Sequence, residues 1–384
     1  MGCNSTYKLY INSLILLFLF AMPTPALSFD MEKGLSESTR VVYMEAFEFF
    51  EKENYGKSTE IIETYLKNGG ENHGLLELLL GNISLKNRDD KSAFIHYLRS
   101  AELFTFSSDM WVSAGEIAYR LGNYKSADRC FERSDKVSPL NDNNLRFWGN
   151  IKFKIKKYDE FPPIAMRLKK KQDADYKRLL YAYAQTKRFK KARKLLQDLS
   201  GKEDWGKWWL LYGSYCMSVD EKESAAALRV YLKSGYPGEK RLHVASLFAK
   251  LKIYDEAYKI FKSVPDEEKE CAYLIKQGIS GYRAGEIKGA EDILNFAITR
   301  KCDHKPVMML GHIYMKDKRY LKAAEVYTNY DYGYKSKYMA ALSYAKGGKP
   351  DKARSMISEL KKENKINNKI LKLEEFINVR YPKK

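Results

Sequence analysis

Glycines recur along this chain at a fixed interval. Gly81, Gly115 and Gly149 follow one another at steps of 34 residues, and the first two are each followed 12 residues later by an alanine. Self-similarity at a period of roughly 20–50 residues indicates a repeat architecture. Because each repeat then contacts only its neighbours, such a chain forms a stack of units rather than one globular core. No other feature of the 384 residues constrains the fold as strongly.

The clearest repeat runs from Trp111 to Pro139. Its large and small residues are, in order, Trp111, Ala114, Gly115, Ala118, Tyr119, Gly122, Tyr124, Ala127, Phe131 and Pro139. This order resembles the tetratricopeptide repeat, a hairpin of two antiparallel helices. Small residues such as Gly115 and Ala127 would let the two helices approach closely, and the large residues would fill the space around that contact. Gly122 is expected to end the first helix, since glycine tolerates the left-handed cap conformation.

The same pattern recurs about ten times along the chain. The residues expected at the close contact of each hairpin are Ser58, Ala93, Ala127, Phe161, Ala192, Ala225, Ala257, Ala290, Ala323 and Ala353, at intervals of 30 to 35 residues. One more helix is predicted over 371–381, where an open stack needs a cap. The resemblance therefore predicts an all-α fold. We expect a right-handed superhelical solenoid over 29–366, with a capping helix and tail over 367–384.

Two stretches depart from the pattern, around 161–175 and around 201–220. In the first, Phe161 replaces the expected alanine and is followed by Pro162 and Pro163. Proline suits the first turn of a helix but not its interior. We therefore expect a shortened, displaced second helix there, with a bend in the superhelix. Three tryptophans crowd the second stretch.

The first 28 residues have the pattern of a secretory signal peptide. Lys8 supplies a positive start, residues 14–22 form an apolar run, and small residues precede a cleavage point near Ser28. The run has nine residues, whereas a membrane span needs about 20. We therefore expect an exported, periplasmic protein with no membrane span in its mature form. Residues 1–6 also fit an N-myristoylation pattern, but the apolar run directly behind them favours export.

The charge balance is strongly basic. Lys and Arg number 68 against 49 Asp and Glu, a net charge of +19. Sixteen of the basic residues, with aromatic residues between them, lie in Asn150–Lys194, against four acidic ones. In a cytosolic protein this composition would favour nucleic acid, but export argues against that partner. It favours an anionic polysaccharide, a lipid headgroup or an acidic protein segment; the alternative is a solvated, lysine-rich convex face.

No pattern typical of an enzyme is found. The sequence lacks a phosphate-binding glycine loop, a dinucleotide fingerprint, a zinc-protease motif and a nucleophile elbow. Cys302, His304 and His312 come closest to a metal site, but a fourth ligand is missing. We therefore expect no catalytic residues, no cofactor and no metal. A polysaccharide-modifying enzyme would need paired carboxylates in a pocket, and none can be placed.

Two cysteines are placed to form a disulfide. Cys271 opens the first helix of the eighth repeat and Cys302 follows the second helix, 31 residues later. Antiparallel helices bring both positions to the same end of the hairpin, and an oxidising compartment favours the bond. It would stabilise the fold by about 3–4 kcal/mol. Cys130 and Cys216 lie too far apart to pair, and the alternative is four free, buried thiols.

The family resemblance also implies a binding groove, lined by the first helix of each repeat. In repeats three to five the groove positions include Glu116, Tyr119, Arg120, Arg146, Asn150, Phe153, Lys154, Lys177, Tyr181 and Gln185. Arg146 and Asn150 resemble the basic residue and asparagine with which some such domains bind a terminal carboxylate. Tyr181 stands where the next repeat would supply a second asparagine, so the carboxylate site is incomplete. A groove of this kind binds an extended or helical peptide.

The resemblance therefore implies a non-enzymatic scaffold for protein–protein interaction in a cell-envelope complex. The repeat rhythm, the signal peptide and the terminal helix are similar to those of exported proteins that accompany TonB-type energy-transducing systems. The alternative is a scaffold of exopolysaccharide export or biosynthesis, whose basic groove would bind an anionic glycan.

Overall fold

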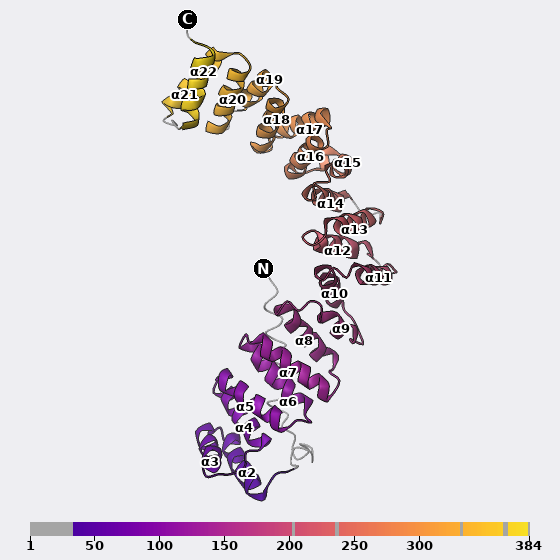
Figure 1. Ribbon diagram of the computed structural model, residues 1–384, viewed down its shortest axis with the longest axis vertical. Coiled ribbons are helices and arrows are strands. Elements are labelled where there is room, and N and C mark those ends of the chain that lie inside the picture. Colours follow the sequence, from indigo (N-terminus) through magenta and orange to yellow (C-terminus); the bar gives the residue numbers. More distant parts are fainter. Residues whose placement is uncertain (1–33, 202–203, 235–237, 331–332, 364–367, 383–384) are drawn as a thin grey trace. The chain divides into compact units, whose positions relative to one another are not determined.

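The computed structural model describes residues 34–201, 204–234, 238–330, 333–363 and 368–382 (Figure 1). The expected signal peptide, residues 1–28, lies outside these ranges. All regular structure in the described residues is helical, as predicted. None of the described helices is long and apolar enough to cross a bilayer.

The chain divides into two compact units, Met1–Thr186 and Lys187–Lys384. The helices of unit 1 are α2 (Glu37–Glu51), α3 (Tyr55–Lys67), α4 (Gly74–Lys86), α5 (Asp90–Leu103), α6 (Ser108–Arg120), α7 (Tyr124–Val137), α8 (Asp142–Lys154), α9 (Phe161–Met166) and α10 (Asp173–Gln185).

The helices of unit 2 are α11 (Phe189–Leu199), α12 (Gly206–Cys216), α13 (Glu221–Leu232), α14 (Gly238–Lys250), α15 (Tyr254–Lys262), the 3₁₀ turn η1 (Asp266–Glu268), α16 (Cys271–Arg283), α17 (Ile287–Thr299), α18 (Lys305–Lys316), α19 (Tyr320–Asn329), α20 (Tyr334–Lys346), α21 (Pro350–Lys362) and α22 (Asn368–Arg380).

Within each unit the helices stack as hairpins. Each even-numbered helix from α2 to α8 and from α12 to α20 packs against the odd-numbered helix that follows it. We call the even-numbered helix of a pair its first helix and the odd-numbered one its second helix. The division of the chain falls between α10 and α11, the two helices of the fifth repeat.

The ten residues predicted at the close contacts all lie in second helices, α3 to α21. All ten are buried, with exposed fractions between 0% and 3%. Burial of all ten therefore confirms the predicted positions in these helices. The predicted terminal helix is confirmed as α22, which buries Ile370, Leu373 and Ile377 and packs against α20 and α21.

A glycine in the first helix faces a large side chain 16 residues later. A Cβ on Gly115 would lie 2.9 Å from the ring of Phe131, closer than real Cβ atoms approach. Gly278 meets Leu294 at 2.6 Å in the same register, and both large side chains are fully buried. The glycine therefore makes room for the side chain that fills the centre of the hairpin.

The fourth repeat reverses this arrangement. The ring of Phe161, not the residue 16 positions on, lies 2.8 Å from where a Cβ of Gly149 would be. Ala165, at the position that holds a large side chain elsewhere, is 2% exposed. Large and small residues have thus exchanged places. The exchange goes with a second helix, α9, of only six residues, which confirms the predicted shortening.

Buried charges join α7, α8 and the turn before α9. Lys152 is 3% exposed, and its Nζ lies 2.5 Å from both Asp128 Oδ1 and Glu160 Oε2. Trp148 donates its indole N–H to Asp128 at 2.7 Å. Burial tends to raise the pKa of Glu160, but hydrogen bonds from Lys152 and Lys157 outweigh it and hold that pKa below its usual value.

Left-handed turns link the two helices of many hairpins. Gly122 has φ of +74° there, as predicted. In other repeats the equivalent turn residue is Arg88, Lys156 or Lys318, with φ between +59° and +61°. These long side chains are exposed. The hairpin therefore imposes this conformation even where no glycine is present.

Candidate interaction surfaces

The predicted groove residues lie on three consecutive first helices of unit 1. Tyr119 and Arg120 are on α6, Arg146, Asn150, Phe153 and Lys154 on α8, and Lys177, Tyr181 and Gln185 on α10. Ring contacts and an ion pair join these helices to one another, and among the predicted residues Phe153 and Tyr181 are in direct contact.

Aromatic rings form the first of these links. The ring of Tyr119 lies 4.9 Å from that of Phe147 on α8, edge to face. The ring of Phe153 lies 5.8 Å from that of Tyr181 on α10, and also contacts the rings of Tyr158, at 5.3 Å, and Phe161, at 4.7 Å. Because Tyr119, Phe153 and Tyr181 are only partly buried, each ring holds two helices together and still offers an edge to a ligand.

Arg146, the predicted carboxylate ligand, already has acceptors within the chain. Its Nε donates to Asp175 at 3.2 Å, and its terminal nitrogen donates to the carbonyl of Lys170 at 2.5 Å. Asp175 is 2% exposed. A terminal carboxylate would have to displace this buried carboxylate, which would then lose its partner. Arg120 is likewise paired, with Asp90 at 2.9 Å.

Lys154 and Lys177 are exposed, and no acidic side chain of the described residues pairs with either. The Nζ of Lys154 lies 5.8 Å from the centre of the Tyr124 ring. Glu116, another predicted groove residue, is a partly buried carboxyl on α6. Burial raises the pKa of Glu116 to about 7, although the charge of Arg120 opposes the shift.

The basic segment Asn150–Lys194 is divided between the two units. Its last residues, from Lys187, belong to unit 2. In unit 1 some of its cations have acidic partners: Lys152 is buried against Asp128, and Arg167 binds Asp135 with two hydrogen bonds of 2.6 Å. Its binding capacity therefore rests on the remaining exposed cations.

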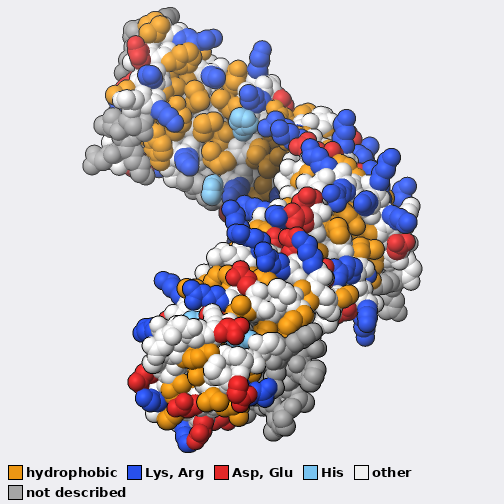
Figure 2. Space-filling view, turned by 60° about the horizontal axis from the view of Figure 1, so that its bottom comes forward, with side chains coloured by type: hydrophobic (Ala, Val, Ile, Leu, Met, Phe, Trp, Pro, Cys, Tyr) orange, Lys and Arg blue, Asp and Glu red, His pale blue; other side chains and the backbone are white. Residues whose placement is uncertain are grey.

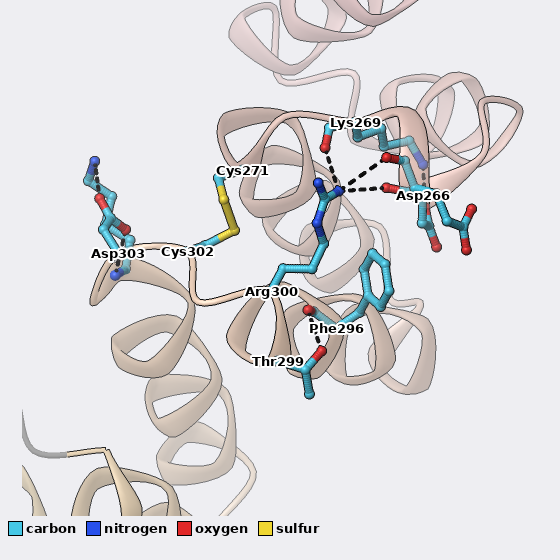
Figure 3. Close-up of a disulfide and its surroundings, with 10 residues drawn as sticks. Asp266, Lys269, Cys271, Phe296, Thr299, Arg300, Cys302 and Asp303 are labelled. Atoms are coloured by element: carbon cyan, nitrogen blue, oxygen red, sulfur yellow. Dashed lines mark hydrogen bonds and ion pairs between the residues drawn. A yellow bond between two sulfur atoms is a disulfide. The ribbon is translucent and has the colours of Figure 1, made fainter.

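The structure joins Cys271 and Cys302 in a disulfide, the pair favoured by the sequence (Figure 3). Beside it, Arg300 donates to the carbonyls of Lys269, at 2.9 Å, and Glu267, at 3.3 Å. The side chain of Lys269 is fully buried and pairs with Asp266. The bond and these contacts hold the end of α17 to the start of α16. Cys130 and Cys216 are free and buried, and the described residues contain no cluster of three metal-ligating side chains.

Unit 2 contains a surface that the sequence analysis missed. The first helices α16, α18 and α20 carry cations but no acidic residue. They also carry partly buried apolar side chains: Ile279, Tyr282, Met308, Met315, Tyr338 and Leu342. A count of acids helix by helix would have found it.

A sequence model of the tetratricopeptide repeat family matches residues 108–139, the repeat with the clearest pattern. No curated protein matches the chain. The chain thus contains a tetratricopeptide repeat within an all-α array of stacked helix hairpins.

Solved structures with similar helical arrays share little sequence with this chain. The structure of Naa15/Naa10 bound to HypK-THB matches with a TM-score of 0.46 and 13% identity, over 90% of this chain and 64% of that one. The pentatricopeptide repeat protein PPR10 from maize has a TM-score of 0.46 and 14% identity, over 97% and 59%. A tetratricopeptide repeat protein from Parabacteroides merdae has a TM-score of 0.29 and 14% identity, over 89% and 99%. This chain spans less than two thirds of the first two.

Proposed function

We propose that this protein is a non-enzymatic scaffold that binds segments of other proteins along the first helices of its hairpins. One observation carries the proposal: neighbouring first helices each carry a partly buried aromatic ring and an exposed lysine. Phe153 and Tyr181 do so beside Lys154 and Lys177. Partly buried rings supply apolar contact at low entropic cost, and exposed cations supply electrostatic attraction.

We further propose that the protein acts in the periplasm, in a complex of the cell envelope. The signal-peptide pattern supports export, and the disulfide between Cys271 and Cys302 supports an oxidising compartment. The repeat rhythm, the export signal and the terminal helix favour TonB-type energy transduction as the setting.

A scaffold of exopolysaccharide export is the second candidate. It is supported by the exposed lysines of unit 1, such as Lys154, Lys169, Lys170 and Lys177, which would attract an anionic glycan.

A pull-down of the mature protein from the detergent-solubilised envelope of its host tests these proposals. The capture is read by mass spectrometry at about 50 mM and about 300 mM salt, between which exposed charge pairs become strongly screened. Inner-membrane TonB-complex proteins at both salts would support the first setting. Glycan or export machinery at low salt alone would support the second. Failure to retain any envelope protein or glycan above a matched bait control at either salt would contradict the scaffold function.

A variant tests the basic surface of unit 1. Reversing three charges (Lys154→Glu, Lys177→Glu, Arg178→Glu) is expected to weaken capture at low salt. Unchanged capture would show that these cations do not bind the partner.

A further inference from the structure

We propose that α16, α18 and α20 form a docking surface for an acidic amphipathic helix of a partner protein. We call it the acid-free surface, defined by the exposed side chains of these three first helices. The inference rests on the proposed scaffold function and names the chemistry of one partner.

The apolar part of this surface has members in three repeats. On each helix its residues recur at helical spacing: Ile279 and Tyr282 on α16, Met308 and Met315 on α18, Tyr338 and Leu342 on α20. Helices α16 and α18 are in contact. Tyr282, Met308 and Met315 pack against one core cluster, and Ser343 of α20 donates to the sulfur of Met315 at 3.0 Å.

These apolar side chains are only partly buried, although they pack on a core. At the upper end of Figure 2, where the C-terminal helices lie, orange hydrophobic side chains cover a broad area. Blue lysines and arginines surround them, with few red acidic side chains. A contiguous apolar patch rimmed by polar groups is typical of an interaction site.

The charges on this surface have one sign. The three helices carry seven cations, Lys276, Arg283, Lys305, Lys316, Lys335, Lys337 and Lys346, and no acid. Arg283, Lys316 and Lys335 are exposed and have no acidic partner among the described residues. Of the acids in the adjoining turns, Asp303 pairs with Lys305 at 2.9 Å and Asp317 with Arg319 at 2.8 Å, whereas Glu270 and Glu286 are exposed, so cations outnumber available acids around these helices. The complementary partner is therefore acidic.

The hydrogen-bonding groups on the surface favour a helix over an extended peptide. An extended peptide presents unpaired N–H groups that need acceptors, whereas a helix satisfies its own backbone. These three helices contain no Asn, Asp, Glu or Thr, and Gln277, Ser280, Ser336 and Ser343 are buried. Apart from tyrosine hydroxyls and the ring of His312, the accessible polar side chains are thus cationic donors, which suit carboxylates at the margins of an apolar helix face.

Three labelled peptides of about 18 residues test the inference by fluorescence anisotropy with the mature full-length protein. The first has leucines on one helical face and glutamates elsewhere. The second replaces the glutamates with lysines, and the third is the acidic peptide interrupted by two prolines. We expect the acidic helix to bind at least about tenfold more tightly than either of the others at about 50 mM salt. Equal affinity for the acidic and basic peptides, or for the helical and proline-interrupted ones, would overturn the inference.

Charge reversal locates the binding site. The variant Arg283→Glu/Lys316→Glu/Lys335→Glu should weaken binding of the acidic helix about tenfold, since each exposed pair contributes modestly. The matched control reverses three exposed lysines on the second helices of the same repeats, Lys288→Glu/Lys322→Glu/Lys352→Glu, and should bind as the parent does. Equal loss in both variants would show a net-charge effect and refute the docking surface.

The envelope pull-down separates this inference from the scaffold function. Two results together would reject the acid-free surface and still support the scaffold function. They are capture of partners that the triple reversal on α16, α18 and α20 does not change, and peptide binding with no preference for the acidic helix. A further outcome is binding of the protein to phosphatidylglycerol vesicles but not to the acidic peptide. That result would identify a lipid surface as the occupant and overturn the proposal.

Discussion

Replacing Lys152 with methionine should destabilise unit 1 more than any exposed lysine change can. Lys152 is 3% exposed and Asp128 5%, and the two are joined at 2.5 Å. Removing one partner of a buried ion pair costs about 3–5 kcal/mol, because the other charge stays buried without it. Asp128 keeps the indole of Trp148 at 2.7 Å and Lys157 at 3.4 Å. Because Glu160 is also partly exposed, we expect the lower end, about 3 kcal/mol.

Hydrogen exchange read by mass spectrometry measures this locally. A loss of about 3 kcal/mol corresponds to protection lowered by about 10²-fold, confined to peptides from α7, α8 and α9. The matched control is Lys154→Met, an exposed lysine on the same helix, which should change protection by less than about threefold. The double variant Asp128→Asn/Lys152→Met should be less destabilised than the sum of the single changes. If hydrogen-exchange protection of α7, α8 and α9 in Lys152→Met stays within about threefold of the parent, the buried ion pair does not stabilise unit 1 as argued.

Three further sets of variants are expected to change the free energy of unfolding, in a direction or under a condition that the structure specifies. Gly311→Ala should destabilise unit 2 by about 1–3 kcal/mol, because the new Cβ overlaps a buried tyrosine ring. Gly56→Ala in α3, where the new Cβ meets open space, should instead stabilise the fold by up to about 1 kcal/mol. Urea unfolding measures both changes, and the same sign in both variants would contradict the packing argument. Cys271→Ser/Cys302→Ser should lose about 3–4 kcal/mol in oxidising buffer and become insensitive to reductant; a reductant effect that persists in the double variant would exclude the disulfide as its cause. The folded pKa of Glu116, about 7, lies above its ordinary 4.5, so stability should fall by up to about 3 kcal/mol as pH rises through that window. Glu116→Gln should flatten this pH profile, and an unchanged profile would assign it to another group.

The repeat register could be read from sequence because each hairpin is built from local contacts. Ala127 packs within its own hairpin, and the glycine–aromatic contact between Gly115 and Phe131 spans only 16 residues. Spacing alone therefore locates the buried positions, including that of Phe161 in the fourth repeat. The short helix of that repeat was predicted from Pro162 and Pro163, but the position of the Phe161 ring over Gly149 could not be predicted, because it depends on how the two helices pack. The left-handed turn at Lys156 could not be predicted from the sequence either, because a lysine does not indicate the φ of +59° that the hairpin imposes there.

Only the tertiary structure showed which charged side chains are buried in ion pairs and which are exposed. Lys152 and Lys154 are near neighbours on α8, yet one is buried in an ion pair and the other is exposed. The guanidinium of Arg146 reaches Asp175, 29 residues away, so the predicted carboxylate ligand has a partner of its own. The sequence by itself determined the helices, their pairing into hairpins and the end of the hairpin at which Cys271 and Cys302 lie. The packing of neighbouring helices decided the pairing of Lys152 and Arg146, because their partners Asp128 and Asp175 lie on other helices and far away along the chain.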